Sequence, residues 1–199
     1  MKYEDFLKQK IEQQTEANMA EFDDYVESPA GQLKIKNLVN NNAHLNLDTN
    51  TLTKDATAHD PYAVALIQKN PRRQNISEKA FFEFTGVTKL PQNGSGAVRF
   101  GDSKAADFKV GDYYGTQKYI KDTGGSQDNQ ISDAIAFANS ARAAGEKAII
   151  CIDGGEYAKN RISQRLTNDD DTIIMSADEL KAGIDSGRFA KNTTLHQES

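Results

Sequence analysis

An aspartate and two lysines fall on neighbouring segments and could form one chemical site. Asp107 stands in the segment 105–110, and Lys118 and Lys121 stand toward the end of the segment 113–121. The Gly111-Asp112 pair between the segments indicates a β-hairpin, which would bring the carboxylate near the lysines. A carboxylate can hold a hard cation such as Mg²⁺, and a lysine can stabilise the charge that develops on a phosphate. These residue types suit Mg²⁺-dependent hydrolysis of a phosphodiester bond.

The elements around this hairpin alternate between helix and strand patterns. A helix is expected near residue 76, with Ser77 as its N-cap and Gly86 as its end. Short strands are expected at 97–100, 148–152 and 172–175, and further helices follow Ser126 and the capping box of residues 176–179. This order predicts the α/β class, with a central mixed β-sheet flanked by helices.

The first seventy residues have a different character. Residues 3–26 carry apolar side chains at helical spacing, and 32–39 form another short helical pattern. The polar stretch 40–60 is expected to be a loop. The predicted organisation is therefore a helical N-terminal segment at 1–70, a core at 71–189 and a polar tail at 190–199.

Several short runs resemble a known family of nucleases. They are Ala106-Asp107-Phe108, the run Lys118-Tyr119-Ile120-Lys121, and the run Gly124-Gly125-Ser126-Gln127-Asp128-Asn129-Gln130 that follows it. Arg72-Arg73-Gln74 before a helix that bears Glu78, and Lys89-Leu90-Pro91 before Gly94-Ser95-Gly96, belong to the same set. Between Pro71 and Glu179 the chain resembles the PD-(D/E)XK nuclease superfamily, and within it the type II restriction endonucleases. The resemblance implies a restriction-endonuclease-like fold.

The resemblance also implies roles for the hairpin residues. Asp107 would be a catalytic residue and a ligand of Mg²⁺. The family pattern directs the residue before the catalytic lysine into the core, and Ile120 suits that position better than Gln117, so Lys121 is preferred as the catalytic lysine. Because side chains alternate between the faces of a strand, Lys118 would lie on the opposite face and contact DNA instead.

The chain departs from the family pattern in one respect. Neither lysine has an acidic residue two positions before it, since Thr116 and Tyr119 stand there. The second metal-binding carboxylate must then come from another element, and some superfamily members take it from a helix. Glu78 is the preferred source, as a catalytic and metal-binding residue, and Glu83 and Asp128 are alternatives.

Other polar residues have both a binding and a purely structural interpretation. Amide side chains can pair with adenine in the major groove and basic pairs can hold phosphates, but such residues are also often solvated. The same holds for the aspartate and the lysines across the hairpin, which could be a surface ion pair. The candidates for DNA contact are Lys118, Gln127, Asp128, Asn129, Gln130, Arg72 and Arg73.

The composition limits the class of protein. The 199 residues carry a net charge of −5, and residues 1–60 hold 11 acidic and 6 basic side chains, which argues against a protein that coats nucleic acid nonspecifically. The single cysteine, Cys151, excludes an intramolecular disulfide framework, and its apolar surroundings predict a buried, inert thiol. Without a membrane-length apolar stretch or an apolar run at the start, we expect a cytoplasmic, intracellular protein with no membrane partner.

These expectations combine into one functional prediction with two rivals. The prediction is a Mg²⁺-dependent, sequence-specific endonuclease that acts as a homodimer on a short palindromic site in double-stranded DNA. The first rival is a nuclease of the same superfamily that recognises DNA structure, as in repair or junction cleavage. The second is a nonenzymatic DNA-binding protein with a decayed site, which the missing acidic residue favours.

Overall fold

The computed structural model describes residues 1–68, 73–121 and 125–190, and the chain divides into two compact units. The sheet unit comprises Met1–Leu7 and Gln74–Ser199, and the helical unit comprises Lys8–Arg73. The first seven residues therefore belong with the sheet, although the sequence placed them in the N-terminal helical segment. Of the predicted tail at 190–199, only Ala190 lies within the described residues.

The sheet unit is built on a mixed β-sheet. The described residues form five strands in the order β1-β2-β3-β4-β5, which are β1 (Thr88–Lys89), β2 (Phe108–Val110), β3 (Tyr113–Tyr119), β4 (Lys147–Asp153) and β5 (Thr172–Met175). β1, β2 and β3 pair in antiparallel fashion, whereas β3, β4 and β5 are parallel. The hairpin at Gly111-Asp112 and the α/β class with a mixed sheet are thereby confirmed.

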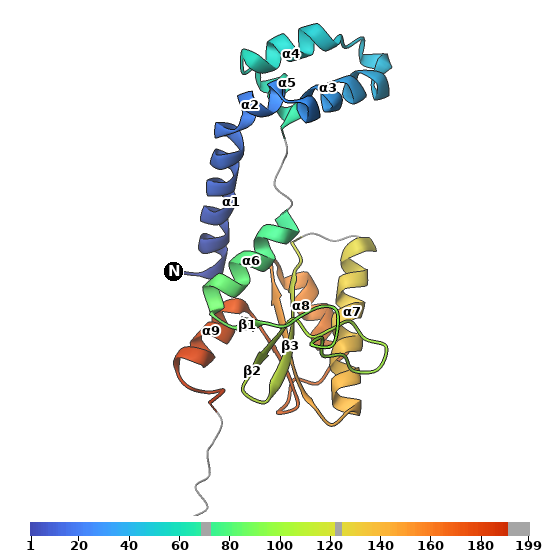
Figure 1. Ribbon diagram of the computed structural model, residues 1–199. Helices are drawn as coiled ribbons and strands as arrows, with labels where there is room; N and C mark the ends of the chain where they lie inside the picture. Colours follow the sequence, from blue (N-terminus) through green and yellow to red (C-terminus); the bar gives the residue numbers. More distant parts are fainter. Residues whose placement is uncertain (69–72, 122–124, 191–199) are drawn as a thin grey trace, which may run out of the picture. The chain divides into compact units, whose positions relative to one another are not determined.

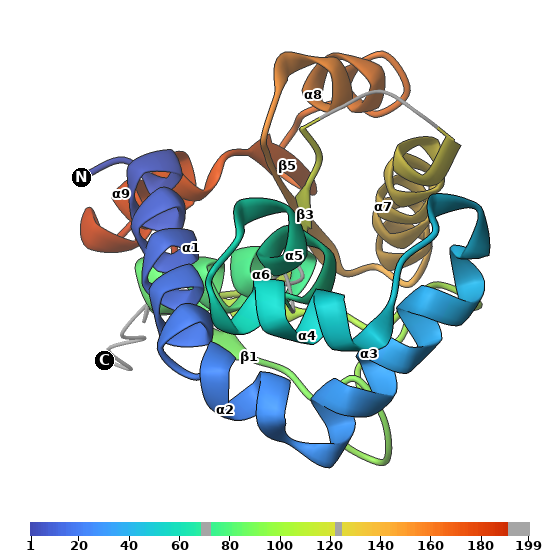
Figure 2. The same ribbon diagram turned by 90° about the horizontal axis from the view of Figure 1, so that it is seen from above.

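Helices cover both faces of this sheet. α7 (Gly125–Ala143) and α8 (Glu156–Ser163) lie on one face, and α6 (Arg73–Thr85) and α9 (Ala177–Asp185) lie on the other (Figures 1 and 2). β4 is buried on both sides, as its continuous apolar run predicts. Its Ile150 and Ile152 pack with Ile131 and Ala134 of α7. The capping box at the start of α9, formed by Ser176 and Glu179, is confirmed.

Two local predictions in the sheet unit are wrong. α6 begins at Arg73, so Ser77 is not its N-cap but a buried residue inside the helix, whose carbonyl oxygen accepts a hydrogen bond from the Tyr3 hydroxyl. Residues 97–100 form no strand; a backbone hydrogen bond from the Ala106 amide to the Val98 carbonyl oxygen joins them to the segment before β2, and Phe100 packs beside Tyr114 and Phe137. Gly86, with φ 73°, does follow the last residue of α6, as the sequence indicates.

The helical unit has a small apolar core of its own. Its elements are the part of α1 (Tyr3–Ala20) from residue 8 onward, α2 (Phe22–Glu27), α3 (Pro29–Asn41), the 3-10 turn η1 (Ala43–Leu45), α4 (Thr49–Thr57) and α5 (Pro61–Ile67). The buried cluster contains Phe22, Val26, Ile35, Leu52 and Ile67. Each unit thus has a core through which it can be held together separately.

The loop predicted for residues 40–60 is wrong in its second half. Asp48 caps α4 by accepting a hydrogen bond from the Thr51 amide, as an N-cap aspartate should. Leu52 and Ala56, four residues apart on one helix face, are both buried. Two apolar contacts and one cap are enough to form a helix in a stretch whose average composition is polar.

None of the helices in the described part of the chain has the length and apolar character needed to cross a bilayer.

Candidate active site

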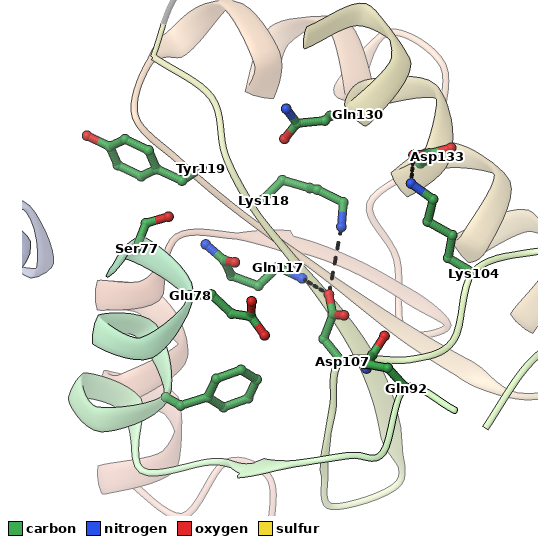
Figure 3. A pocket seen from close by; sticks show the side chains of 11 residues that line it. Ser77, Glu78, Gln92, Lys104, Asp107, Gln117, Lys118, Tyr119, Gln130 and Asp133 are labelled. Carbon is green, nitrogen blue, oxygen red and sulfur yellow. Dashed lines mark hydrogen bonds and ion pairs between the residues drawn. The ribbon is translucent and has the colours of Figure 1, made fainter. Parts of the chain in front are cut away.

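A polar cavity of about 370 Å³ opens in the sheet unit, at the end of the hairpin (Figure 3). Its walls come from α6, β3, α7 and the loop that leads into β2. The lining residues are Ser77, Glu78, Phe82, Gln92, Lys104, Asp107, Gln117, Lys118, Tyr119, Gln130 and Asp133. The cavity therefore collects three carboxylates, two lysines and three amides on elements that are distant in sequence.

Asp107 is held rigidly in the floor of this cavity. Its backbone amide donates to the carbonyl oxygen of Gly115, and its carbonyl oxygen accepts from the Leu90 amide, which fixes it between β3 and the segment after β1. Its Oδ2 accepts hydrogen bonds from Thr116 Oγ1 at 2.9 Å and from the Gln117 amide at 2.8 Å. These contacts leave Oδ1 without a hydrogen bond in the part of the chain that the structure describes.

Lys118, and not Lys121, is the lysine that meets this carboxylate. Lys118 Nζ lies 3.8 Å from Asp107 Oδ2, and its side chain is only 17% exposed. Phe108 pairs with Gly115, so Asp107 stands beside Thr116, and Lys118 is two residues further along the same strand face. Lys121, which the sequence preferred as the catalytic lysine, is exposed and follows the end of β3.

The three candidates for the second metal-binding carboxylate lie in different places. Glu78 lines the cavity and forms an ion pair with Lys89 of β1. Glu83 is not in the lining, and Asp128 is exposed and accepts a hydrogen bond from the Tyr157 hydroxyl at 3.1 Å. Of the three carboxylates that the sequence proposed, only Glu78 lies in the cavity with Asp107.

The predicted DNA contacts are placed in three different ways. Gln130 lines the cavity from α7, while Gln127 and Asn129 of the same helix do not. Lys118 also lies in the cavity, beside Asp107. Arg72 and the side chain of Arg73 lie outside the described residues.

Sequence reasoning proposed no site role for six polar residues of the cavity, which are Ser77, Gln92, Lys104, Gln117, Tyr119 and Asp133. Asp133 stands three residues after Gln130, so the two lie on one face of α7, and the helical spacing could have identified it. Asp133 pairs with Lys104 from the loop before β2, and a contact of that sequence separation leaves no local signal. Gln117 was discounted because its position was expected to be apolar.

Gln117 has an unusual environment. Its side chain is 8% exposed, and its Nε2 is buried with no hydrogen-bond partner within the residues that the structure describes. A buried amide donor without an acceptor lowers stability, so a residue of this kind in a cavity wall suggests a partner that arrives with a ligand.

The donor set suits a hard divalent cation. The residues described contain no group of three or more His, Cys, Asp or Glu side chains arranged to hold a metal. Mg²⁺, however, typically takes one or two carboxylates and completes its coordination with water and substrate phosphate. Asp107 and Glu78, both oxygen donors in one polar cavity, fit that requirement.

A second polar group lies apart from this cavity, at the carboxyl end of β4. Asp153 is 8% exposed, and both its carboxyl oxygens accept from the Ala177 amide, at 3.1 and 3.2 Å. Burial raises the pKa of Asp153 to about 7, and the charges of Glu4 and Asp178 act in the same direction. Cys151 is fully buried, as predicted, and burial raises the pKa of its thiol.

Comparison of the chain with protein-family models, curated proteins and solved structures found no match. The class that the structure defines is therefore an α/β protein with a five-stranded mixed sheet in its described residues, and the functional argument depends on the cavity.

Proposed function

We propose that the chain is a Mg²⁺-dependent endonuclease that hydrolyses phosphodiester bonds of double-stranded DNA, with a restriction-endonuclease-like arrangement of its sheet unit. The observation that carries the proposal is the pairing of Asp107 and Lys118 in one cavity with Glu78 and Gln130. Cleavage at a short specific sequence, by two copies of the chain, is the part of the proposal that rests on the resemblance in sequence.

The side chains of the cavity divide the chemistry between them. Attack by a water oxygen on phosphorus forms one P–O bond and breaks the bond to a sugar oxygen; the water loses a proton, and the leaving oxygen gains one. The Lys118 ammonium group, only partly exposed, stabilises the negative charge that grows on the phosphate. Asp107 and Glu78 would hold Mg²⁺, which when bound polarises the phosphate and makes water more acidic.

The position of Thr116 supports a rival function. Thr116 occupies the place of the acidic residue in the family pattern, and its hydroxyl donates to Asp107 rather than adding a negative charge. A chain of this kind could bind DNA without cutting it. In the proposed nuclease, Glu78 of α6 supplies the carboxylate that Thr116 lacks.

Cleavage of unmethylated phage DNA with Mg²⁺ and with EDTA tests the proposal. We expect discrete fragments with Mg²⁺ alone, and a loss of rate of about a hundredfold or more in Asp107→Asn and Lys118→Met, since each removes a group that acts on the transition-state charge. Lys121→Met is the matched control and should retain activity.

Other outcomes of this experiment would favour one of the two rival functions or the other lysine. A smear instead of discrete bands would favour cleavage guided by DNA structure. Binding to DNA without cleavage under any divalent metal would favour the nonenzymatic protein. Full activity of Lys118→Met with an inactive Lys121→Met would show that the site has been assigned to the wrong lysine.

A further inference from the structure

Two cavities of the sheet unit share Glu78 and Phe82 in their walls, and Glu78 is the charged residue of the two. It lines the polar cavity described above, and it also lines a neighbouring cavity of about 470 Å³ together with Lys79, Phe82 and Lys89. We call these the inner and the outer cavity. A side chain between two cavities has two directions in which its carboxylate can turn.

The partner on the outer side is Lys89. Its ammonium group binds Glu78 Oε1, and the two side chains are 51% and 44% exposed. Lys89 Nζ also lies 5.6 Å from the centre of the Phe82 ring. Because exposed ion pairs contribute little to stability, a ligand with a stronger charge can take Glu78 from Lys89 at small cost.

The partner available on the inner side is Gln117. Its buried Nε2 donates no hydrogen bond within the described residues, while its own backbone amide binds the Asp107 carboxylate. Figure 3 shows Glu78 extending from α6 to the side of the cavity where Gln117 and Asp107 lie. An acceptor that reached this amide would remove the penalty of a buried, unsatisfied donor.

We propose that Lys89 keeps the Glu78 carboxylate from bonding to Gln117 Nε2 when no cation is bound, and that Glu78 turns to Gln117 Nε2 when a divalent cation binds beside Asp107. Lys89 and Gln117 are then positioning residues that act through Glu78. The inference rests on the proposed function for the identity of the cation site. It adds the two residues that position the second metal-binding carboxylate.

The charge of the inner cavity explains why such a device is useful. Two of its carboxylates are paired with lysines inside the cavity, Asp107 with Lys118 and Asp133 with Lys104. If Glu78 stood unpaired beside Asp107, two carboxylates would repel each other across a polar space. Lys89 removes that repulsion until a cation supplies the compensating charge.

Direct binding of Mn²⁺ to the full-length chain, followed by the electron paramagnetic resonance signal of the free ion, tests the outer partner. Lys89→Met should tighten Mn²⁺ binding about two- to fivefold, the range expected when an exposed ion pair no longer competes. Lys79→Met is the matched control, because it removes the same charge from the same outer cavity without breaking the pair. In a Glu78→Gln background, Lys89→Met should leave the affinity unchanged.

Gln117→Leu tests the inner partner with two readouts. Removing a buried donor that has no acceptor should raise the unfolding midpoint of the metal-free chain by about 2–4 °C. The same substitution should weaken Mn²⁺ binding about tenfold, since it removes the hydrogen bond to a charged carboxylate. A purely structural glutamine would give the opposite sign in the first measurement.

The inference and the proposed function can fail separately. Equal tightening by Lys89→Met and Lys79→Met, or tightening that persists in Glu78→Gln, overturns the inference even if the wild-type chain cuts DNA. If the Lys89 and Gln117 variants change Mn²⁺ binding as expected but the wild-type chain cuts no DNA, the positioning of Glu78 is supported and the proposed nuclease function is overturned. A wild-type chain that binds no Mn²⁺ overturns both.

Discussion

The buried environment of Asp153 changes its acid–base behaviour within the pH range from 4 to 7. Its folded-state pKa of about 7 stands above the ordinary value of 3.8 because the group is buried. Between these two values the folded chain keeps a proton that the unfolded chain has lost. Its contribution to stability is therefore fully present below about pH 4 and is lost as pH rises to 7, by up to about 4 kcal/mol.

Asp153→Asn should remove this loss. The free energy of unfolding of the variant minus that of the wild type should increase as pH rises from 4 to 7 and then level off, in urea titrations at each pH. Asp102→Asn, at an exposed residue, gives the baseline for the loss of one acidic group. A difference between Asp153→Asn and wild type that stays flat with pH would mean that Asp153 is ionised throughout.

At the residue scale, the sequence could predict that Asp107 lies near a lysine, but not which lysine that is. The hairpin signal placed Asp107 near both lysines; the hairpin is present, but Lys121 lies beyond the end of β3. The choice between Lys118 and Lys121 depended on whether Gln117 or Ile120 faces the core, and both are buried. An apolar preference could not anticipate a buried amide, because its burial reflects the cavity and not its own polarity.

The end of β4 is an element whose backbone requires glycine. Gly154 has φ 103°, and a Cβ at this position would lie 2.7 Å from the carbonyl oxygen of Ile120. The Ile120 amide donates to the Asp153 carbonyl oxygen at 2.8 Å, so the chain after β3 and the end of β4 approach closely. Any side chain at Gly154 must separate them.

Gly154→Ala should therefore lower the free energy of unfolding of the sheet unit by more than the cost of a positive φ alone. Gly145 is the matched position, since it has φ 75° and no atom within 4 Å of its ideal Cβ. We expect Gly145→Ala to cost about 1–2 kcal/mol and Gly154→Ala about 2–5 kcal/mol, because a clash is added. Equal midpoints of the two variants in urea would argue against the close approach.

Local signals predicted elements well where capping and burial agreed. The Ser176–Glu179 capping box marked the start of α9 correctly. At α6 the serine signal was misleading, because Ser77 is held inside the helix by packing and by its carbonyl bond to Tyr3. That partner lies 74 residues away, and a contact at such a distance leaves no trace in local spacing.

At the scale of the whole chain, the division into units depends on further long-range contacts of Tyr3. The Tyr3 amide donates to Asp178, and its ring lies 5.5 Å from that of Phe84. These contacts attach the first residues to the sheet unit rather than to the helices that follow them. Composition indicated a change of character near residue 70, but it could not show that the chain starts in one unit and then enters the other.

The proposed substrate sets a requirement on the number of chains. A duplex has two strands to be cut, whereas the chain carries a single Asp107–Lys118 pair. A two-fold dimer presents one pair to each strand of a palindromic site. We therefore expect light scattering to give twice the 21.9 kDa of one chain in the active species, and wild-type protein to convert supercoiled plasmid to linear DNA with little nicked circle.

Mixing wild-type chains with an excess of Asp107→Asn chains tests this requirement. In a dimer that exchanges subunits, most wild-type chains would then be paired with an inactive partner, so each productive encounter would cut one strand. Nicked circles should accumulate in proportion to the excess. If the chain acts alone, wild-type protein by itself should already pass through nicked circles, and added variant should change the rate but not the ratio of nicked to linear product. The ratio therefore reports how many pairs act together, independently of how fast either strand is cut.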